Sequence, residues 1–75
     1  MMTEKAIAIE IDYTNWRGER AWRTVIPLQV VYESNSWHPE KQWLMMAYDP
    51  AKHSVRSFAL AGIHGFLTTK GSEDE

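Results

Sequence analysis

The 75-residue sequence has no cysteine, only four glycines and three prolines, and no long hydrophobic run. The lack of cysteine excludes disulfides and thiolate metal sites, and it fits a reducing cytosol. The first residues lack the basic and apolar segments of a secretory signal. No apolar stretch approaches the ~20 residues that a membrane helix needs. We therefore expect a cytoplasmic protein without a membrane segment.

The sequence patterns of metal sites and enzymes are missing as well. The three histidines, His38, His53 and His64, include no pair at the i, i+4 spacing of a helical metal site. There is no glycine-rich phosphate loop and no glycine-framed serine, and His38 is interpreted as a polar loop residue. The sequence thus predicts a non-enzymatic protein with no metal and no cofactor.

The charge is close to balanced, with a net value of −2. Residues 70–75 carry three acidic residues and one lysine, which leaves seven acids and seven bases in the rest of the chain. General nucleic-acid binders depend on an excess of lysine and arginine, so broad DNA binding is disfavoured. We expect a single domain over residues 1–69 and a disordered acidic tail over residues 70–75.

A domain of this size has a marginal core, because it buries only about 60% of the surface that its unfolded chain exposes. Small domains are often stabilised by disulfides, a metal or self-association. Since the first two lack residues here, we expect a homo-oligomer.

Period-two alternation of apolar residues, typical of strands, dominates the chain. Strands are expected over residues 7–13, 22–32, 42–48, 54–60 and 63–67. Pro27 cannot donate to a strand ladder, so it marks an edge, a bulge or a sharp bend. The strand over residues 42–48 is apolar on both faces and should be the most buried. Within the second strand, one face should carry Trp22, Ile26, Leu28, Val30 and Tyr32.

Five short strands separated by turns predict an all-β domain, as a small barrel or a strongly curled sheet. The successive blocks I-x-Y, G-E, R-T-V-I-P-L, W-L-M-M-A-Y-D and R-S-F-A-L-A-G-I resemble the WYL domain of bacterial and phage regulatory proteins. Residues 43–45 match the triplet that gives the family its name. The resemblance covers about residues 7–66. It implies a five-stranded SH3-like or Sm-like barrel that senses ligands, with nucleotides or nucleic acids as the usual ligands.

The chain departs from the family pattern in its later strand. Ala59, Ala61 and Gly62 stand where the family has an arginine, an aspartate and another arginine, and Leu44 replaces the tyrosine of the triplet. The resemblance therefore implies a phosphate pocket with fewer charges than in relatives.

Arg23 and Arg56 are the main candidates for an anion site, because a guanidinium group binds phosphate through two hydrogen bonds. If they lie on neighbouring strands, they can converge from one face. The alternative is that each forms a surface ion pair with an acid such as Glu10 or Asp12. Tyr13 is either a ligand-contacting residue or a core tyrosine with its hydroxyl at the rim.

The four tryptophans divide between strands and loops. Trp22 and Trp43 lie in expected strands, which favours core packing, although Trp43 is also a candidate for the pocket wall. Trp16 and Trp37 lie in expected loops, where they can stack on a ligand, contact another subunit or cover the core.

The sequence therefore predicts a regulatory domain that senses or sequesters a nucleotide-like or other anionic ligand through Tyr13, Arg23, Trp43 and Arg56. A first alternative is an SH3-like module that binds a partner protein or peptide through Trp16, Tyr32 and Trp37. A second is a binder of single-stranded nucleic acid or an oligonucleotide, which the neutral body disfavours.

Overall fold

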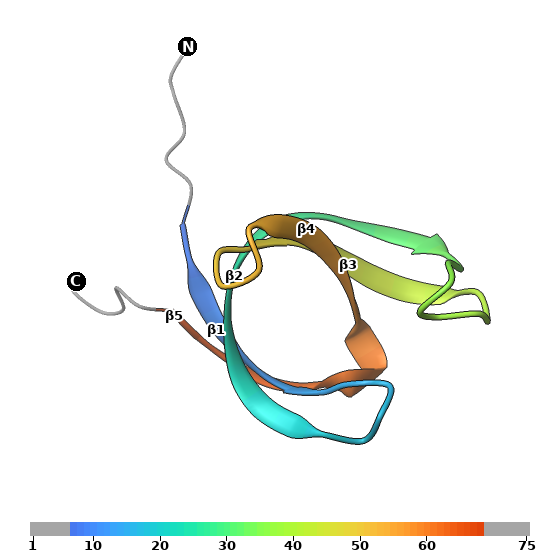
Figure 1. Cartoon of the computed structure of the whole chain (residues 1–75), viewed down its shortest axis with the longest axis horizontal. Coiled ribbons are helices and arrows are strands. Elements are labelled where there is room, and N and C mark those ends of the chain that lie inside the picture. The colour runs from blue at the N-terminus through green and yellow to red at the C-terminus, as the bar shows by residue number, and fades with distance from the viewer. Residues whose placement is uncertain (1–6, 69–75) are drawn as a thin grey trace, which may run out of the picture.

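A computed structural model describes residues 7–68 of the chain (Figure 1). The elements are β1 (Ile9–Thr14), β2 (Arg20–Glu33), β3 (Gln42–Asp49), β4 (Ser54–Ala59), the 3-10 helix η1 (Leu60–Gly62) and β5 (Ile63–Thr68). The predicted all-β class is confirmed, and each expected strand is present with ends shifted by a few residues. The predicted disordered tail lies outside the described residues. Residues 7–68 include no helix long and apolar enough to span a membrane.

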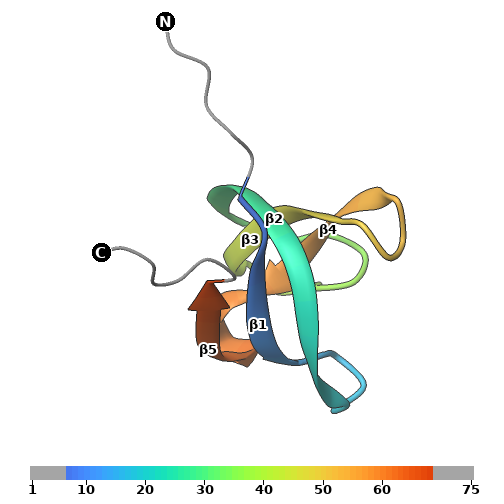
Figure 2. The same cartoon turned by 90° about the vertical axis from the view of Figure 1, so that its left-hand side faces the viewer.

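The five strands form one antiparallel sheet in the order β4-β3-β2-β1-β5. The 14-residue β2 belongs to both halves of this sheet, since residues 20–25 pair with β1 and residues 26–33 pair mainly with β3. Figures 1 and 2 show that the sheet consequently curls around the core. Its end strands, β4 and β5, are connected through η1 but are not paired with each other. The sheet is thus curled and not closed into a barrel.

A bulge in β2 reverses the direction in which its side chains point. Before the bulge, Val25 is fully buried and Pro27 lies opposite the core residue Ala47. The pairing register then shifts between Pro27 and Gln29, so that Val30 lies opposite the core residue Met45. An inserted residue changes which face every later side chain occupies. The predicted common face of Trp22, Ile26, Leu28, Val30 and Tyr32 is therefore wrong, because it ignores the inserted residue at the bulge.

The core lies on the concave face of the sheet. Its buried residues are Ile11, Tyr13, Val25, Met45, Ala47 and Phe58, and Ile9, Leu60 and Ile63 pack against them. As predicted, β3 contributes more buried residues than any other strand. The prediction that two strand tryptophans are in the core is wrong: Trp22 is 53% exposed and Trp43 is 54% exposed. Trp22 lies opposite Asp12 on the outer face, and Trp43 lies beyond the end of the core.

Candidate functional site

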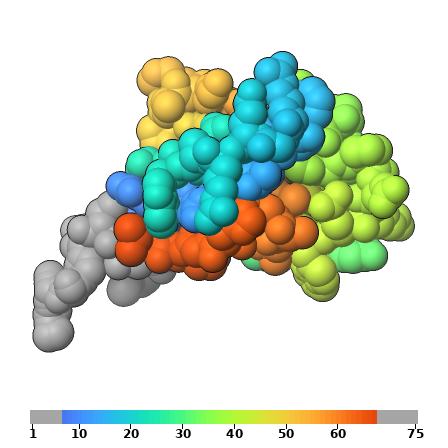
Figure 3. Space-filling view, turned by 90° about the horizontal axis from the view of Figure 1, so that it is seen from below, coloured from blue at the N-terminus to red at the C-terminus, as the bar shows by residue number. Residues whose placement is uncertain are grey.

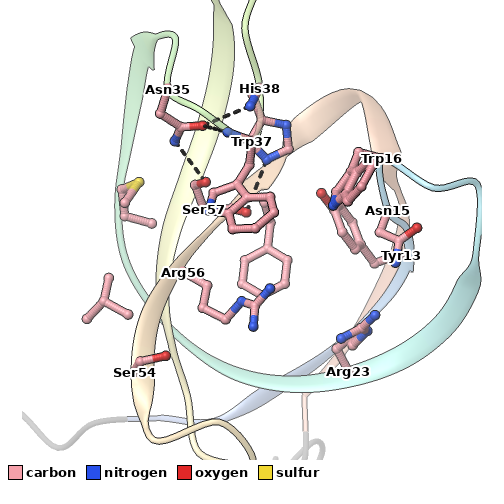
Figure 4. Close-up of a pocket in the computed structure, with 13 residues that line it drawn as sticks. Tyr13, Asn15, Trp16, Arg23, Asn35, Trp37, His38, Ser54, Arg56 and Ser57 are labelled. Carbon is pink, nitrogen blue, oxygen red and sulfur yellow. Dashed lines mark hydrogen bonds between the residues drawn. The ribbon is translucent and has the colours of Figure 1, made fainter.

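A pocket of about 460 Å³ lies in the hollow of the curled sheet, between β4 and the loops that follow β1 and β2. Figure 4 shows its walls. It contains five of the six residues that the sequence suggested for a site: Tyr13, Trp16, Arg23, Trp37 and Arg56. The sixth, Trp43, does not line it and instead contacts Tyr32, with their ring centroids 5.3 Å apart.

Both arginines of the pocket come from the concave face of the sheet. Arg23 lies opposite the buried Ile11, and Arg56 lies opposite the buried Ala47. They are not on neighbouring strands, because β3 separates β2 from β4. The curl of the sheet brings the two strands round the same hollow, into which both guanidinium groups point (Figure 4).

The pocket has a positive wall with no compensating acid. Among its lining residues Arg23 and Arg56 carry charge, and none is aspartate or glutamate. Within residues 7–68, neither arginine has a carboxylate oxygen within 4.0 Å, because the single ion pair found there joins Arg20 to Asp12. The alternative pairing of the site arginines with Glu10 or Asp12 is therefore not observed. A buried donor without an acceptor is costly, and the Nε atom of Arg23 is such a donor.

Tyr13 connects the core to the rim of the pocket. Its side chain is buried, and its ring meets Phe58 edge-to-face with 5.1 Å between centroids. Its hydroxyl accepts a hydrogen bond of 3.1 Å from the backbone N–H of Ala59, which holds the edge of β4 against β1. Tyr13 is therefore packed as a core residue, and its side chain also forms part of the pocket wall.

Two loop tryptophans meet at the mouth of the pocket. The rings of Trp16 and Trp37 are 6.1 Å apart and inclined at 38°, and both side chains are more than half exposed. Figure 3 shows their loops in contact on the surface of the molecule. The guanidinium of Arg17 lies 5.2 Å from the Trp16 ring centroid, as a cation–π contact. Exposed aromatic rings beside positive charge can stack on planar groups of an anionic ligand.

An asparagine organises each of these loops. The Asn15 side-chain oxygen accepts hydrogen bonds from the backbone N–H groups of Arg17 and Glu19, both at 2.9 Å. The same loop turns at Gly18, whose φ of +83° favours glycine. The Asn35 side-chain oxygen accepts from the N–H groups of Trp37 and His38 at 3.0 and 2.8 Å. Both tryptophans are thus presented by hydrogen-bonded turns.

The loop that follows β2 is hydrogen-bonded to β4 beside Arg56. Asn35 donates through Nδ2 to the Ser57 hydroxyl at 3.0 Å, and His38 donates through Nε2 to the Ser57 carbonyl at 3.3 Å. His38 is consequently buried, unlike the simple polar loop residue that the sequence suggested. Asn35, His38 and Ser57 were not predicted as site residues from the sequence. An asparagine two residues before a loop tryptophan is a signal of a turn, but the contact with β4 has no local signal.

A second, shallower pocket of about 390 Å³ adjoins the first. The two share Tyr13, Asn15, Trp16 and His38, while the second adds Thr14 and His64, which hydrogen-bond to each other at 2.8 Å. No group of three histidine, aspartate or glutamate residues within 7–68 could hold a metal ion. The charged and aromatic side chains of the combined site are of kinds that can bind an anion and stack on a planar group.

Comparison with known proteins identifies one family. A family model described as the WYL domain matches residues 4–66, which is most of the chain. No curated protein matches the sequence.

Proposed function

Since the chain belongs to the WYL domain family, we propose that it senses or sequesters an anionic, nucleotide-like ligand in the pocket between Arg23 and Arg56. WYL domains are in general regulatory domains that sense ligands or nucleic acids. We also propose that this sheet, which is open between β4 and β5, is a variant of the SH3-like or Sm-like barrels.

The observation that carries the proposal is the pair of arginines without acidic partners. Arg23 is half-buried, so its guanidinium loses hydration without gaining an ion pair within residues 7–68, and an anion in the site would offset this cost. Arg56 is exposed and keeps much of its hydration, so it adds positive charge to the site without the same cost. A phosphate group between Arg23 and Arg56 would accept charge-assisted hydrogen bonds from the guanidinium nitrogens that face the pocket. This supports a phosphate-bearing ligand over a neutral one.

The aromatic groups favour a ligand with a planar part. Trp16 and Trp37 line the same pocket as the arginines, so one ligand can contact both. A base stacked on an aromatic side chain contributes about 1–3 kcal/mol. A nucleotide combines the two features, which supports it over inorganic phosphate.

The test is isothermal titration of the protein with a panel of mononucleotides, short oligonucleotides and inorganic phosphate. We expect Arg56→Ala and Arg23→Ala each to weaken nucleotide binding at least tenfold, because each removes a charged hydrogen-bond donor. Lys52→Ala is the matched control: it removes one positive charge from an exposed residue outside both pockets. Equal affinities in all three variants would overturn the assignment of the site.

The same titration addresses the peptide-binding alternative. Tyr32, one of its three aromatic residues, pairs with Trp43 and lies outside the pocket of Trp16 and Trp37. A module of that kind would bind an extended peptide through aromatic contacts and would be insensitive to the loss of Arg56. Failure of every nucleotide to bind, with normal folding, would favour this alternative.

A further inference from the structure

An uncovered apolar strip continues the core face along the β2–β3 hairpin. It consists of Val30, Tyr32 and Trp43, which we call the hairpin strip. Val30 lies opposite the core residue Met45, and Tyr32 lies opposite Trp43, so all three face the same side as the core. They are nevertheless 50–56% exposed. The hairpin strip is thus a part of the core face that residues 7–68 leave open.

The strand that carries most of the strip also has an unpaired edge. Between residues 28 and 33, β2 is paired with β3 on one side, whereas its pairing with β1 extends no further than Val25. Within residues 7–68 no strand pairs with the other edge of this segment. Figure 1 shows this part of the hairpin extending beyond the curled body. Proteins commonly protect such edges with lysine or proline, and residues 28–33 contain neither.

We propose that this edge and the hairpin strip bind a second copy of the chain, with β2 pairing antiparallel to β2 around a two-fold axis at Val30. An interface of this kind uses the same surface on both copies. It also joins the two sheets into one through backbone hydrogen bonds, and it brings the two hairpin strips together on one face.

The side chains suit this pairing. With Val30 opposite its own copy, Leu28 lies opposite Tyr32, and Gln29 lies opposite Val31. Glu33 lies opposite Pro27, so no like charges face each other across the interface. Apolar and aromatic pairs directly opposite each other are the pairs that stabilise antiparallel strands.

The area of the surface is also enough for a dimer. A half-exposed aromatic side chain offers roughly 100 Å². The hairpin strip together with the exposed Leu28 then offers about 400 Å² of apolar surface per copy. Homodimer interfaces are about 65% apolar, so two such surfaces would correspond to at most about 1,200 Å² in total, which is reached only where the second copy covers all of this apolar area. This lies at the lower end of specific interfaces and favours a dimer that dissociates on dilution.

Disulfide trapping tests the proposed axis, because the natural chain has no cysteine. Residues directly opposite each other in antiparallel strands have Cα atoms about 4.5–5.5 Å apart, within the range for a disulfide. Val30→Cys should therefore form a covalent dimer within minutes of mild oxidation at micromolar concentration. Val55→Cys is the matched control: it is the same substitution at a 53% exposed position of the edge strand β4. Equal or slower crosslinking of Val30→Cys would overturn the proposal.

Sedimentation and amide hydrogen exchange of the natural chain give a second test. We expect reversible dimerisation and concentration-dependent protection within residues 28–33. Val30→Lys should weaken dimerisation at least tenfold, because two lysines would then face each other at the axis. A natural chain that stays monomeric up to a millimolar concentration would overturn the proposal, as would complex formation through this edge with a different protein alone. Neither result depends on the ligand of the arginine pocket.

Discussion

At the scale of single residues, Gly62 occupies a position of this backbone that has no room for a side chain. A Cβ atom at this position would lie 2.5 Å from the carbonyl oxygen of Thr14 and 3.0 Å from the Tyr13 ring. The arginine that the family pattern has at this position would meet the same obstruction. The loss of that arginine therefore goes together with close packing of η1 against β1.

We predict that Gly62→Ala destabilises the fold by about 1–3 kcal/mol, because backbone or the buried Tyr13 ring must move to admit the methyl group. Urea unfolding followed by tryptophan fluorescence measures the change. Gly65→Ala is the control, because its Cβ would meet no atom within 4 Å. Equal stability of the two variants would show that η1 is not tightly packed against β1.

The ion pair between Asp12 and Arg20 leads to a second prediction at this scale, on how stability depends on pH. Hydrogen bonds from Arg20, at 2.9 and 2.8 Å, hold the pKa of the Asp12 carboxyl below its ordinary value of 3.8. Partial burial opposes this shift, while the positive charges of Arg20 and His64 add to it. A lowered carboxyl pKa stabilises the fold above pH 3.8, and this contribution is lost as the pH falls through the folded-state value.

The expected result is that part of the acid destabilisation below pH 4 disappears in Asp12→Asn. Urea unfolding between pH 6 and pH 2.5 measures it. Glu40→Gln provides the comparison, since Glu40 is exposed and has no ion pair in the described chain. If Asp12→Asn and the natural chain lose stability in parallel below pH 4, the ion pair contributes nothing to folding.

At the scale of elements, the loop after β2 positions one wall of the site. Asn35 holds the backbone of Trp37 and His38 and reaches Ser57 on β4. We predict that Asn35→Ala lowers the free energy of unfolding by about 1–3 kcal/mol, because it removes the hydrogen bonds that the side chain accepts from the Trp37 and His38 N–H groups and the part-buried bond that it donates to Ser57. It should also weaken ligand binding several-fold by releasing Trp37.

Near-UV circular dichroism can follow this release through the Trp16–Trp37 contact. Asn35→Asp is the matched variant, because it keeps the oxygen that accepts from both N–H groups and loses the donor to Ser57. Its dichroism should resemble that of the natural chain, whereas Asn35→Ala should lose the contribution of the tryptophan pair. Indistinguishable spectra for the natural chain and Asn35→Ala would contradict a positioning role.

The strands show which features of the fold could be predicted from the sequence. Period-two alternation located all five strands, because a half-buried strand imposes that pattern on its residues. Pro27 indicated an edge, a bulge or a bend, and a bulge occurs there. The sequence could not choose among these three, and the choice decides which face Val30 and Tyr32 occupy. The prediction that Trp22 and Trp43 are in the core failed because a large apolar side chain is buried only where another part of the protein packs against its face of the sheet.

The candidate site was likewise predictable in its residue types but not in its contacts. Arg23, Arg56, Trp16 and Trp37 could be selected by their chemistry, and the structure brings all four to one pocket. Their meeting depends on the curl of β2, which carries residues far apart in the sheet to one hollow. The contacts of Asn35 and His38 with Ser57 span about twenty residues of sequence, so no local pattern predicts them.

At the scale of the whole molecule, the charge balance limits how the site can attract anions. The net charge is −2, so the molecule as a whole does not draw a negatively charged ligand toward it. In the proposed site, the affinity for an anion must then come from short-range contacts with Arg23 and Arg56. The binding constant of a ligand held by two arginines should therefore depend only weakly on salt concentration, even when the ligand is an oligonucleotide.

We predict that the logarithm of the binding constant for a short oligonucleotide falls with the logarithm of salt concentration at a slope of about −1.4. This follows from roughly −0.7 for each phosphate neutralised on a single strand. Titrations between 50 and 200 mM salt measure the slope, and Arg56→Ala should halve it. A slope steeper than about −3 would require basic residues beyond the pocket. That result would favour an extended nucleic-acid interface over the capture of a small ligand.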